Sequence, residues 1–369
     1  MSDDRAGRIL VLTPDLRLPG GVTNYYNAMA LDREPGIEYF PVNTLGSESR
    51  ARLALRLTTG YCKFIQTLVR QRVRLVHVNP SFNARSFFRD GIFVFLCLLF
   101  RKQLLVFFRG WEESFEARVH RSALLKLFFN ATYRRSRNMV VLGGMFKEKL
   151  IALGADKSRF WLETVVAGDI PGEDFSVDKK VATLDHAPTL LFMSRIEKDK
   201  GVYVAIDAYR HLLERHPRRG LKLIVAGEGA ETHEVRAYAR QIPAADIVFP
   251  GYISGQPKTR VLSDAHILVF PTSHGEGMPN VILEAMLYGM PIVSRSIATV
   301  PDIVTNGENG FLTASEDPQI FADLICALLL DKKKYREVAS TNHERAASLY
   351  TTPKVKARLL RVYDAVLAP

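Results

Sequence analysis

Two glutamates eight residues apart, Glu276 and Glu284, lie where a strand-like segment gives way to a helix-like one. Apolar residues at 267–270 precede them, and the segment from Pro279 to Gly289 has helix punctuation at both ends. A helix that starts after a glycine-rich turn directs free N–H groups and the positive end of its dipole into that turn. The sequence therefore predicts an anion site there. The residues expected to line it are Gly277, Met278, Pro279, Asn280 and Val281.

The two glutamates require a partner other than the anion, because a carboxylate beside a phosphate repels it. Neighbouring hydroxyl groups of a sugar supply one, since a carboxylate accepts two hydrogen bonds and fits a vicinal diol. Phosphate donors together with two such carboxylates are typical of a nucleotide-sugar pocket. The alternative is an ordinary surface loop with two solvated glutamates, and the spacing alone leaves both interpretations open.

The stretch Glu276-Gly-Met-Pro-Asn-Val-Ile-Leu-Glu284 resembles the Glu-x7-Glu motif of the retaining nucleotide-sugar glycosyltransferases of family 4. The resemblance continues through 291–294 and 300–312, and it is weaker in the N-terminal half. It implies a GT-B architecture, in which two Rossmann-like, doubly wound domains face a cleft. It also implies transfer of a hexose or N-acetylhexosamine from a nucleoside diphosphate-sugar, with retention of anomeric configuration, to a glycan or lipid-linked acceptor. Such transfers build cell-surface polysaccharide, lipopolysaccharide or glycolipid. By this resemblance Glu276 positions hydroxyls of the donor sugar, and Glu284 holds the ribose.

Arg195 and Lys200 follow the strand-like run at 189–193, at the strand end where α/β sheets place ligands. Both side chains can reach a diphosphate, and fixed cations stabilise the charge that a departing nucleoside diphosphate gains in the transition state. The segment resembles the family's Arg…Lys-Gly element, and a solvated basic loop is the alternative. Lys198 is a competing candidate that we expect to face solvent. No Asp-x-Asp pair or ligand-spaced His, Cys and Asp cluster accompanies the site, so we expect transfer without a metal or cofactor.

Gly20 and Gly21 follow the first strand-like run. A Gly-Gly pair lets the backbone approach a ligand closely, although a plain tight turn has the same sequence. By resemblance the pair is the family's glycine-rich loop, which faces the acceptor and the diphosphate across the cleft. The backbone at 249–253, which includes Tyr252, resembles the segment that seats the nucleobase. Side chains there do not distinguish uracil from guanine, and we favour a UDP-sugar over a GDP-sugar.

Arg109 stands at a strand end where many family members carry a histidine that faces the donor sugar. It either binds a phosphate or carboxylate of the acceptor or pairs with Glu112 or Glu113, and the sequence favours neither. At 168–169 the chain has Gly-Asp after a strand expected at 164–167, where the family usually has Asn-Gly. These two departures leave the donor sugar and the acceptor open.

Strand-like and helix-like segments alternate along the chain on both sides of a polar stretch at 170–188. This alternation predicts parallel, doubly wound sheets that position the residues named above. With 369 residues, 47% of them hydrophobic, the chain is long and apolar enough for two domain cores. We expect an N-terminal acceptor domain at 1–170, a linker at 170–188 and a C-terminal donor domain at 188–350. By resemblance the closing helix at 352–369 packs back on the N-terminal domain.

The net charge of +11 is concentrated in residues 46–137, which contain 18 Lys and Arg against 5 Asp and Glu. Together with Phe82, Phe87 and Phe88, this basic stretch indicates contact with an anionic membrane surface. No pattern of a nucleic-acid-binding fold accompanies it, so nucleic acid is not expected. The apolar run at 92–100 is too short to span a bilayer, and we expect it to form a buried helix.

Three scattered cysteines suit a reducing compartment, and the N-terminus shows no secretory signal. We therefore expect a cytoplasmic enzyme on the inner face of the membrane. Two other classes compete: another enzyme on the same fold, such as a sugar-nucleotide epimerase or a phosphorylase, and an inactive membrane-bound scaffold. No motif indicates the pyridoxal phosphate lysine that a phosphorylase requires. The intact set of Arg195, Lys200, Glu276 and Glu284 argues against the scaffold.

Overall fold

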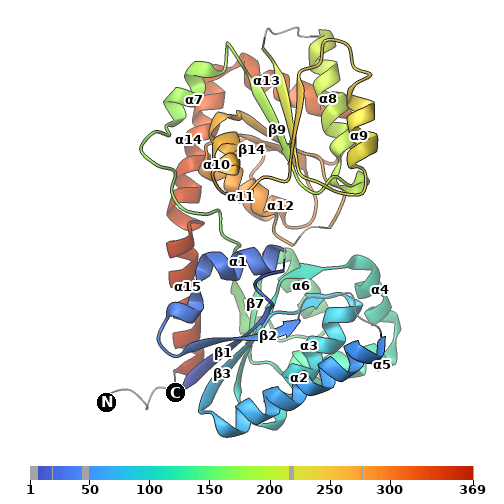
Figure 1. Cartoon of the computed structure of the whole chain (residues 1–369), viewed down its shortest axis with the longest axis vertical. Coiled ribbons are helices and arrows are strands. Elements are labelled where there is room, and N and C mark those ends of the chain that lie inside the picture. The colour runs from blue at the N-terminus through green and yellow to red at the C-terminus, as the bar shows by residue number, and fades with distance from the viewer. Residues whose placement is uncertain (1–6, 19, 44–49, 216–219, 276, 369) are drawn as a thin grey trace. The chain divides into compact units, whose positions relative to one another are not determined.

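Two compact units, each with its own parallel sheet, make up the chain (Figure 1). Unit 1 comprises residues 1–165 and 352–369, and unit 2 comprises residues 166–351. The computed structural model describes residues 7–18, 20–43, 50–215, 220–275 and 277–368. Among these residues, no helix combines the length and the apolar character needed to cross a membrane.

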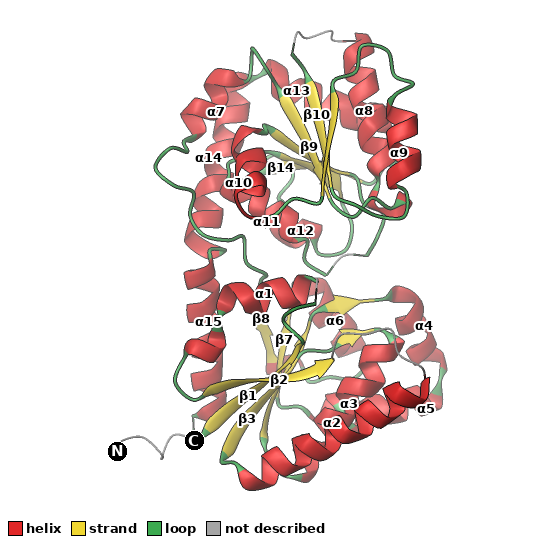
Figure 2. Ribbon diagram, viewed as in Figure 1, coloured by secondary structure: helices red, strands yellow, loops and turns green. Residues whose placement is uncertain are grey.

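Unit 1 is built on six parallel strands in the order β2-β1-β3-β5-β7-β8 (Figure 2). The strands are β1 (Arg8–Pro14), β2 (Ile37–Asn43), β3 (Val73–Val78), β5 (Gln103–Phe108), β7 (Asn138–Val141) and β8 (Phe160–Leu162), with a separate ribbon of β4 (Ser81–Phe82) and β6 (Gly110–Trp111). The helices are α1 (Gly21–Met29), α2 (Arg50–Arg70), α3 (Ala84–Leu99), α4 (Glu113–Arg121), α5 (Ala123–Ala131), α6 (Gly144–Ala152) and α15 (Thr352–Leu367). Val11, Val76 and Val106 at the strand centres are fully buried, as expected for a parallel sheet covered by helices.

The C-terminal helix α15 belongs to unit 1, although the preceding helix belongs to unit 2. Val355 and Leu359 of α15 are fully buried. Arg358 adds an ion pair, in which its guanidinium lies 3.1 Å from the carboxylate of Glu163 at the end of the sheet. Apolar contacts and an ion pair therefore fix α15 on this unit.

Unit 2 repeats the design with six parallel strands in the order β11-β10-β9-β12-β13-β14. The strands are β9 (Thr189–Met193), β10 (Lys222–Ala226), β11 (Ile247–Gly251), β12 (Ile267–Phe270), β13 (Ile292–Arg295) and β14 (Gly310–Thr313). The helices are α7 (Val177–Thr183), α8 (Val202–Arg215), α9 (Thr232–Ala239), α10 (Gly255–Asp264), α11 (Asn280–Leu287), α12 (Val300–Ile303), α13 (Pro318–Leu330) and α14 (Lys332–Leu349). The two sheets confirm the predicted alternation of strands and helices.

Two expectations about the connection between the units were wrong. The segment at 170–188 is not a plain linker, because it contains α7, whose Lys180 and Val181 are buried in unit 2. A lysine at a buried position hides the helical period from the sequence. The apolar run at 164–167 forms no strand. Its Ala167 N–H instead donates to the main-chain oxygen of Tyr350 at 2.8 Å, so the apolar residues there are buried without joining a sheet.

Candidate functional site

The loops that follow β9 and β12 are joined at Asp199. Strand β12 pairs with β9 in the sheet, so the segments 194–201 and 271–279 leave from the same edge. The main-chain oxygen of Asp199 accepts hydrogen bonds from the N–H groups of Ser273 and His274, at 2.8 and 3.2 Å. The Asp199 carboxylate also lies 2.8 Å from Nδ1 of His274. These contacts fix one loop against the other.

Glycines make the close approach of these loops possible. Gly201 has a φ of +78°, and a Cβ on it would lie 2.3 Å from the main-chain oxygen of Pro271. On the other side, Gly227 has a φ of +140°, and its Cβ would lie 1.8 Å from the main-chain oxygen of Ser194. A side chain at either position would push the loops apart. The loop that carries Arg195 is thus held on two sides.

The basic residues of this loop differ in exposure. The Arg195 side chain is 62% exposed, and its Nη1 lies 2.7 Å from the carboxylate of Glu197. Lys198 is exposed, whereas Lys200 at the end of the 3-10 turn η4 (Lys198–Lys200) is only 3% exposed. A ligand can therefore reach Arg195 and Lys198 directly, while Lys200 is covered.

Helix α11 begins at Asn280, so Pro279 is its N-cap residue and not, as the sequence suggested, its first residue. The N–H groups of Asn280 and Val281 lie in the first turn, where a helix offers them no acceptor. Met278 is buried, and the main-chain oxygen of Gly277 accepts a hydrogen bond from the hydroxyl of Thr299. The turn before α11 is therefore anchored, as an anion site requires.

Of the two predicted carboxylates, Glu276 lies outside the described residues and Glu284 lies on α11. The Glu284 carboxylate is 2.9 Å from Nζ of Lys258 on α10, and its side chain is 13% exposed. The sequence did not single out Lys258, because one lysine on an amphipathic helix carries no motif. Asp199 was missed for a related reason, since it sits in a charged run that is typical of a solvated loop.

The predicted nucleobase segment follows β11. Tyr252 is 68% exposed, and the main-chain oxygen of Gly251 accepts a hydrogen bond from the N–H of Gly227 at 2.8 Å. The segment is thereby tied to the same glycine that contacts the loop of Arg195. This hydrogen bond thus fixes the backbone just before Tyr252 at this edge of the sheet.

In unit 1, the structure separates the two alternatives for Arg109. Glu112 accepts a hydrogen bond from the hydroxyl of Ser114 at 2.6 Å, and Glu113 accepts one from Lys149 at 3.2 Å. Neither glutamate forms an ion pair with Arg109 among the described residues. The guanidinium of Arg109 instead stacks on aromatic rings of α1 and β5. The pairing with a neighbouring glutamate is therefore excluded.

The predicted glycine pair, Gly20 and Gly21, lies at the start of α1 in unit 1, and both residues are exposed. A Cβ on Gly21 would meet no atom within 4 Å, so packing within the chain does not require glycine at that position. The pair leaves the backbone of this turn open to solvent.

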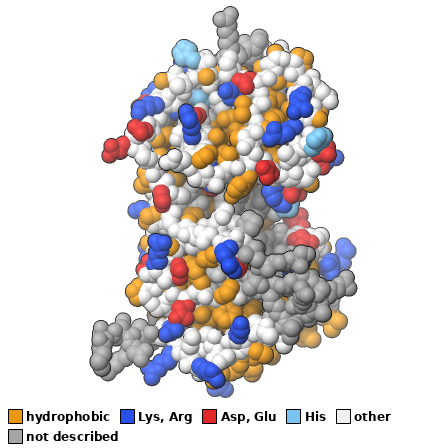
Figure 3. Space-filling model, in the orientation of Figure 1, with side chains coloured by type: hydrophobic (Ala, Val, Ile, Leu, Met, Phe, Trp, Pro, Cys, Tyr) orange, Lys and Arg blue, Asp and Glu red, His pale blue; other side chains and the backbone are white. Residues whose placement is uncertain are grey.

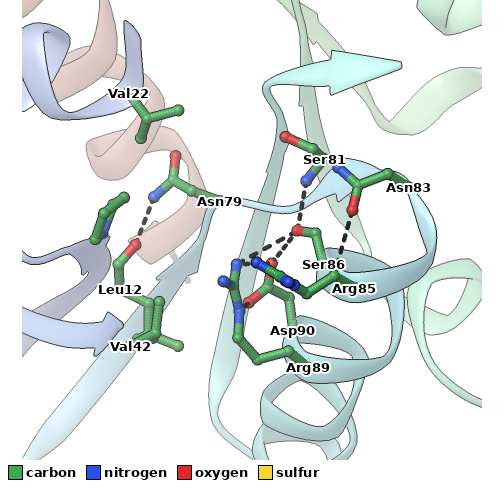
Figure 4. A pocket seen from close by; sticks show the side chains of 11 residues that line it. Leu12, Val22, Val42, Asn79, Ser81, Asn83, Arg85, Ser86, Arg89 and Asp90 are labelled. Carbon is green, nitrogen blue, oxygen red and sulfur yellow. Dashed lines mark hydrogen bonds and ion pairs between the residues drawn. The ribbon is translucent and has the colours of Figure 1, made fainter. Parts of the chain in front are cut away.

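A cavity of about 190 Å³ lies at the ends of β1 and β3 in unit 1 (Figure 4). Most of the polar side chains that line it form hydrogen bonds or ion pairs with one another, as Figure 4 shows. The hydroxyl of Ser86 accepts the N–H of Ser81 at 2.8 Å and donates to the carboxylate of Asp90, which Arg89 neutralises at 2.7 Å. Arg85 also lines the cavity and is exposed, so it is the cation of this wall that a ligand can reach most readily.

Two strongly shifted groups serve the fold of unit 2. The buried ammonium of Lys180 donates to the main-chain oxygens of Leu262, at 3.0 Å, and Ala265, and so closes the end of α10. Burial lowers the pKa of Lys180 to about 7. Burial, followed by the charge of Lys180, lowers the pKa of His266 to about 4. In the described part of the chain, no three His, Cys, Asp or Glu side chains gather as metal ligands.

Sequence comparison finds similarity between unit 2 and a known family. Residues 187–331 match the family described as glycosyl transferases group 1. The chain is 28% identical over 257 residues to a phosphatidyl-myo-inositol mannosyltransferase of Mycobacterium tuberculosis, covering 64% of this chain and 66% of that protein. It is 24% identical over 221 residues to the putative colanic acid biosynthesis glycosyltransferase WcaL of Salmonella typhimurium, covering 58% and 50%. The chain thus spans less than two thirds of the length of each of these relatives.

Solved structures resemble the whole chain. HepE of Anabaena, in complex with UDP and glucose, matches with a TM-score of 0.70 at 17% identity, over 98% of this chain and 100% of that one. Sucrose-phosphate synthase from Thermosynechococcus elongatus matches with a TM-score of 0.73 at 16% identity, over 98% and 99%. At such identities the likeness concerns the fold alone. It confirms the predicted class, a GT-B architecture of two Rossmann-like, doubly wound domains.

Proposed function

We propose that the chain is a glycosyltransferase that moves a hexose or N-acetylhexosamine from a nucleoside diphosphate-sugar to a glycan or lipid-linked acceptor. The product belongs to cell-surface polysaccharide or glycolipid. The observation that carries the proposal is the tie at Asp199, which holds the loop of the exposed Arg195 against the turn that leads into α11. The match to glycosyl transferases group 1 covers both loops. Relatives named for phosphatidyl-myo-inositol and for colanic acid biosynthesis support such an acceptor.

The chemistry we assign to unit 2 is charge stabilisation. As the bond between sugar and phosphate breaks, the departing diphosphate gains negative charge, and Arg195 and the first turn of α11 stabilise it. Lys200 adds positive charge from within the fold. The loop is already fixed by its backbone contacts, so little reorganisation is needed when the charge develops. These cations take the part that a metal ion plays elsewhere, and we propose transfer without metal.

The donor is held through its hydroxyl groups in this proposal. Glu276 positions hydroxyls of the transferred sugar, and Glu284 accepts the ribose hydroxyls while Lys258 orients its carboxylate. The donor's own phosphate oxygen takes the proton of the acceptor hydroxyl, and the sugar retains its anomeric configuration. A UDP-sugar is the proposed donor, which the UDP in the HepE structure supports.

Product analysis tests this function. The purified chain is incubated with a panel of UDP- and GDP-sugars, with and without lipid and glycan extracts that contain candidate acceptors. We expect one donor to lose its sugar to an acceptor and release its nucleoside diphosphate. A donor converted to its epimer without any acceptor would identify a sugar-nucleotide epimerase. No change in any donor would identify a scaffold and overturn the proposal.

We further propose that unit 1 docks on an anionic membrane through one face of α3 and α5. The exposed apolar side chains of this face, here called the apolar stripe, are Phe88, Ile92, Phe95 and Leu99 of α3 with Leu124 and Leu127 of α5. On α3 they recur every three or four residues and therefore share one side of the helix. The rings of Phe88 and Phe128 lie 5.2 Å apart, so the two helices present one continuous surface.

Exposed cations surround the apolar stripe, and they suit a negatively charged surface. Arg85 and Arg101 lie at the two ends of α3, Arg121 is the last residue of α4, and Lys126 lies in the first turn of α5. In Figure 3 hydrophobic side chains lie beside Lys and Arg on the surface of unit 1. Each basic residue near an anionic membrane contributes about 1 kcal/mol of attraction. Basic charge and exposed apolar surface together describe a peripheral membrane face.

The structure corrects the residues first assigned to this face. Phe82 and Phe87 are fully buried in the core of unit 1, where they pack against each other and Phe115. The run at 92–100 is not buried throughout, because only one side of α3 faces the core. Apolar residues on both sides of a helix give no periodicity, so the sequence could not separate the core side from the exposed one.

A further inference from the structure

Arg109 is a buried cation at the end of β5, with 7% of its surface exposed. The central carbon of its guanidinium lies 3.9 Å from the ring centre of Tyr25 and 4.2 Å from that of Phe107. These aromatic rings offset part of the cost of burial. An aromatic ring carries no full negative charge, however, and Arg109 forms no ion pair with any described residue. A buried arginine in this condition is rare in proteins, because burial without a counter-charge is unfavourable.

Two hydrogen-bond donors at this place lack a partner. Neither Nη1 of Arg109 nor the hydroxyl oxygen of Tyr25 has a hydrogen-bond partner among the described residues, although both atoms are buried. Burial raises the pKa of the Tyr25 hydroxyl to about 12, so the group keeps its proton and can donate. Buried polar groups without partners destabilise a fold, so each requires an explanation, and a bound ion or a catalytic role is one.

Two titratable groups among the described residues near Arg109, His77 and Glu163, do not neutralise its charge. Burial, followed by the charge of Arg109, lowers the pKa of the nearby His77 to about 3, so the imidazole is neutral. Glu163 is already paired with Arg358. None of the described residues therefore neutralises the charge of Arg109, which leaves it for a group of a bound substrate.

Main-chain contacts tie the segment of Arg109 to the wall of the cavity of Figure 4. The N–H of Arg109 donates to the main-chain oxygen of Pro80 at 2.8 Å, and the following residue, Gly110, pairs with Ser81 on the cavity wall. The site thus lies at the ends of parallel strands, which is where sheets of this kind bind ligands.

We propose that Arg109 and Tyr25 form an oxyanion site, in which Nη1 and the phenolic hydroxyl donate to a carboxylate or phosphate group of a substrate. This proposal rests on the proposed function, and it assigns a negatively charged group to the sugar donor or to the acceptor. A neutral sugar hydroxyl would satisfy one donor but would leave the buried charge of Arg109 without a counter-ion.

The variant Tyr25→Phe tests the site without disturbing packing. If the hydroxyl were structural, its removal would lower the melting temperature of the ligand-free protein. If the hydroxyl waits for a ligand, its removal relieves an unpaired buried group, and the melting temperature stays the same or rises. Binding of the oxyanion should at the same time weaken by about tenfold, as expected when one hydrogen bond to a charged group is lost. A lower melting temperature together with unchanged binding would overturn the proposal.

Calorimetric titrations of the full chain distinguish the two sources of the oxyanion. A wild-type preference for UDP-glucuronate over UDP-glucose that disappears in Tyr25→Phe and Arg109→Gln places the group on the donor. Binding of inorganic phosphate that weakens in both variants, with no such preference, places the group on the acceptor. Arg70→Gln removes an exposed positive charge at the end of α2 and is the control, since it should change neither titration. No binding of either anion by the wild type, or binding unchanged in both variants, refutes the site.

A separate titration with UDP keeps the two proposals apart. UDP is expected to bind through unit 2, so its affinity should be the same in wild type and in Tyr25→Phe. Failure of the wild type to bind UDP counts against the proposed function, whereas the phosphate titrations still decide the oxyanion site.

Discussion

Nδ1 of His77 lies 2.6 Å from the hydroxyl oxygen of Tyr363, although 286 residues separate the two in the chain. His77 is on the central strand β3 and Tyr363 is on the C-terminal helix α15, and both are fully or almost fully buried. Burial keeps the imidazole neutral, with a pKa lowered to about 3. The hydrogen bond therefore joins two uncharged groups, and it helps to hold the end of the chain on unit 1.

Replacement of Tyr363 by phenylalanine should destabilise unit 1. The change removes only the hydroxyl and leaves Nδ1 of His77 buried without its partner, which costs about 1–3 kcal/mol of unfolding free energy. Urea unfolding followed by tryptophan fluorescence measures the loss, since Trp111 and Trp161 both lie in unit 1. Tyr252→Phe, at an exposed position in unit 2, should leave the transition unchanged. An unaltered midpoint for Tyr363→Phe would show that the hydrogen bond contributes no stability.

The buried Lys180 should make the stability of unit 2 depend on pH above neutrality. Its pKa falls from 10.5 in the unfolded chain to about 7 in the folded one. Between these values the unfolded chain binds a proton that the folded chain has released, so the unfolding free energy rises with pH. The contribution approaches about 1.4 kcal/mol per pH unit. Unfolding between about pH 7 and pH 9 should show a shallower slope for Lys180→Met, while Lys179→Met at the exposed neighbouring position keeps the wild-type slope.

The sequence predicted those elements of the fold whose burial is evident from their amino-acid composition. The runs 189–193 and 267–270 are apolar throughout, because a central parallel strand is covered on both faces, and they became β9 and β12. The sequence shows no helical period for α7, because Lys180 occupies one of its buried positions. The run 164–167 has the composition of a strand, but its backbone bonds to Tyr350 and joins neither sheet.

The candidate site was predictable where residues adjacent in sequence carry the chemistry. The single segment from Gly277 to Glu284 predicts a turn, the start of a helix and a carboxylate. The contacts of Asp199 with His274 and of Lys258 with Glu284 join distant segments, and no local spacing encodes them. The same limit applies to Arg109, because only its neighbours in space show that none of the described residues supplies a counter-charge.

Arg195→Ala should lower kcat about 100-fold, which is the usual loss when one transition-state donor is removed. Its exposed guanidinium belongs to a fixed loop, so the variant should fold normally. Lys198→Ala, on the same loop and also exposed, is the control and should retain most of the activity.

Transfer without metal predicts that the wild-type protein has the same steady-state rate with and without excess EDTA. Strict dependence of the wild type on added magnesium or manganese would contradict transfer without metal.

Glu284→Gln should raise the KM for the donor and change kcat little, because the ribose is bound alike in the ground state and the transition state. The loss of a hydrogen bond to a charged group corresponds to about a tenfold effect. Lys258→Met should shift KM in the same direction by a smaller factor, since Lys258 orients the carboxylate. Initial rates over a range of donor concentrations separate the two constants. A fall in kcat at unchanged KM would place Glu284 at the reacting sugar instead.

Glu276→Gln should mainly lower kcat, because we propose that Glu276 contacts the transferred sugar.

Liposome flotation tests the membrane face of unit 1. Wild-type protein should float with vesicles that contain anionic lipid, and the bound fraction should fall as salt is added, because salt screens the attraction between Lys, Arg and lipid headgroups. The double variant Phe95→Glu with Leu124→Glu places two negative charges in the apolar stripe and should abolish flotation. Both side chains are exposed, so the fold should survive.

A matched control separates the stripe from general hydrophobicity. Leu330 in unit 2 is as exposed as Leu127 of the stripe, and Leu330→Glu should leave flotation unchanged. Arg85→Glu with Arg101→Glu reverses two charges at the ends of α3, and should weaken binding to anionic vesicles without touching the apolar stripe. Neutral vesicles offer no electrostatic attraction, and we expect the apolar stripe alone to bind only weakly, so flotation with neutral vesicles should be weak for every variant. Equal flotation with neutral and anionic vesicles would show that the basic residues play no part in docking.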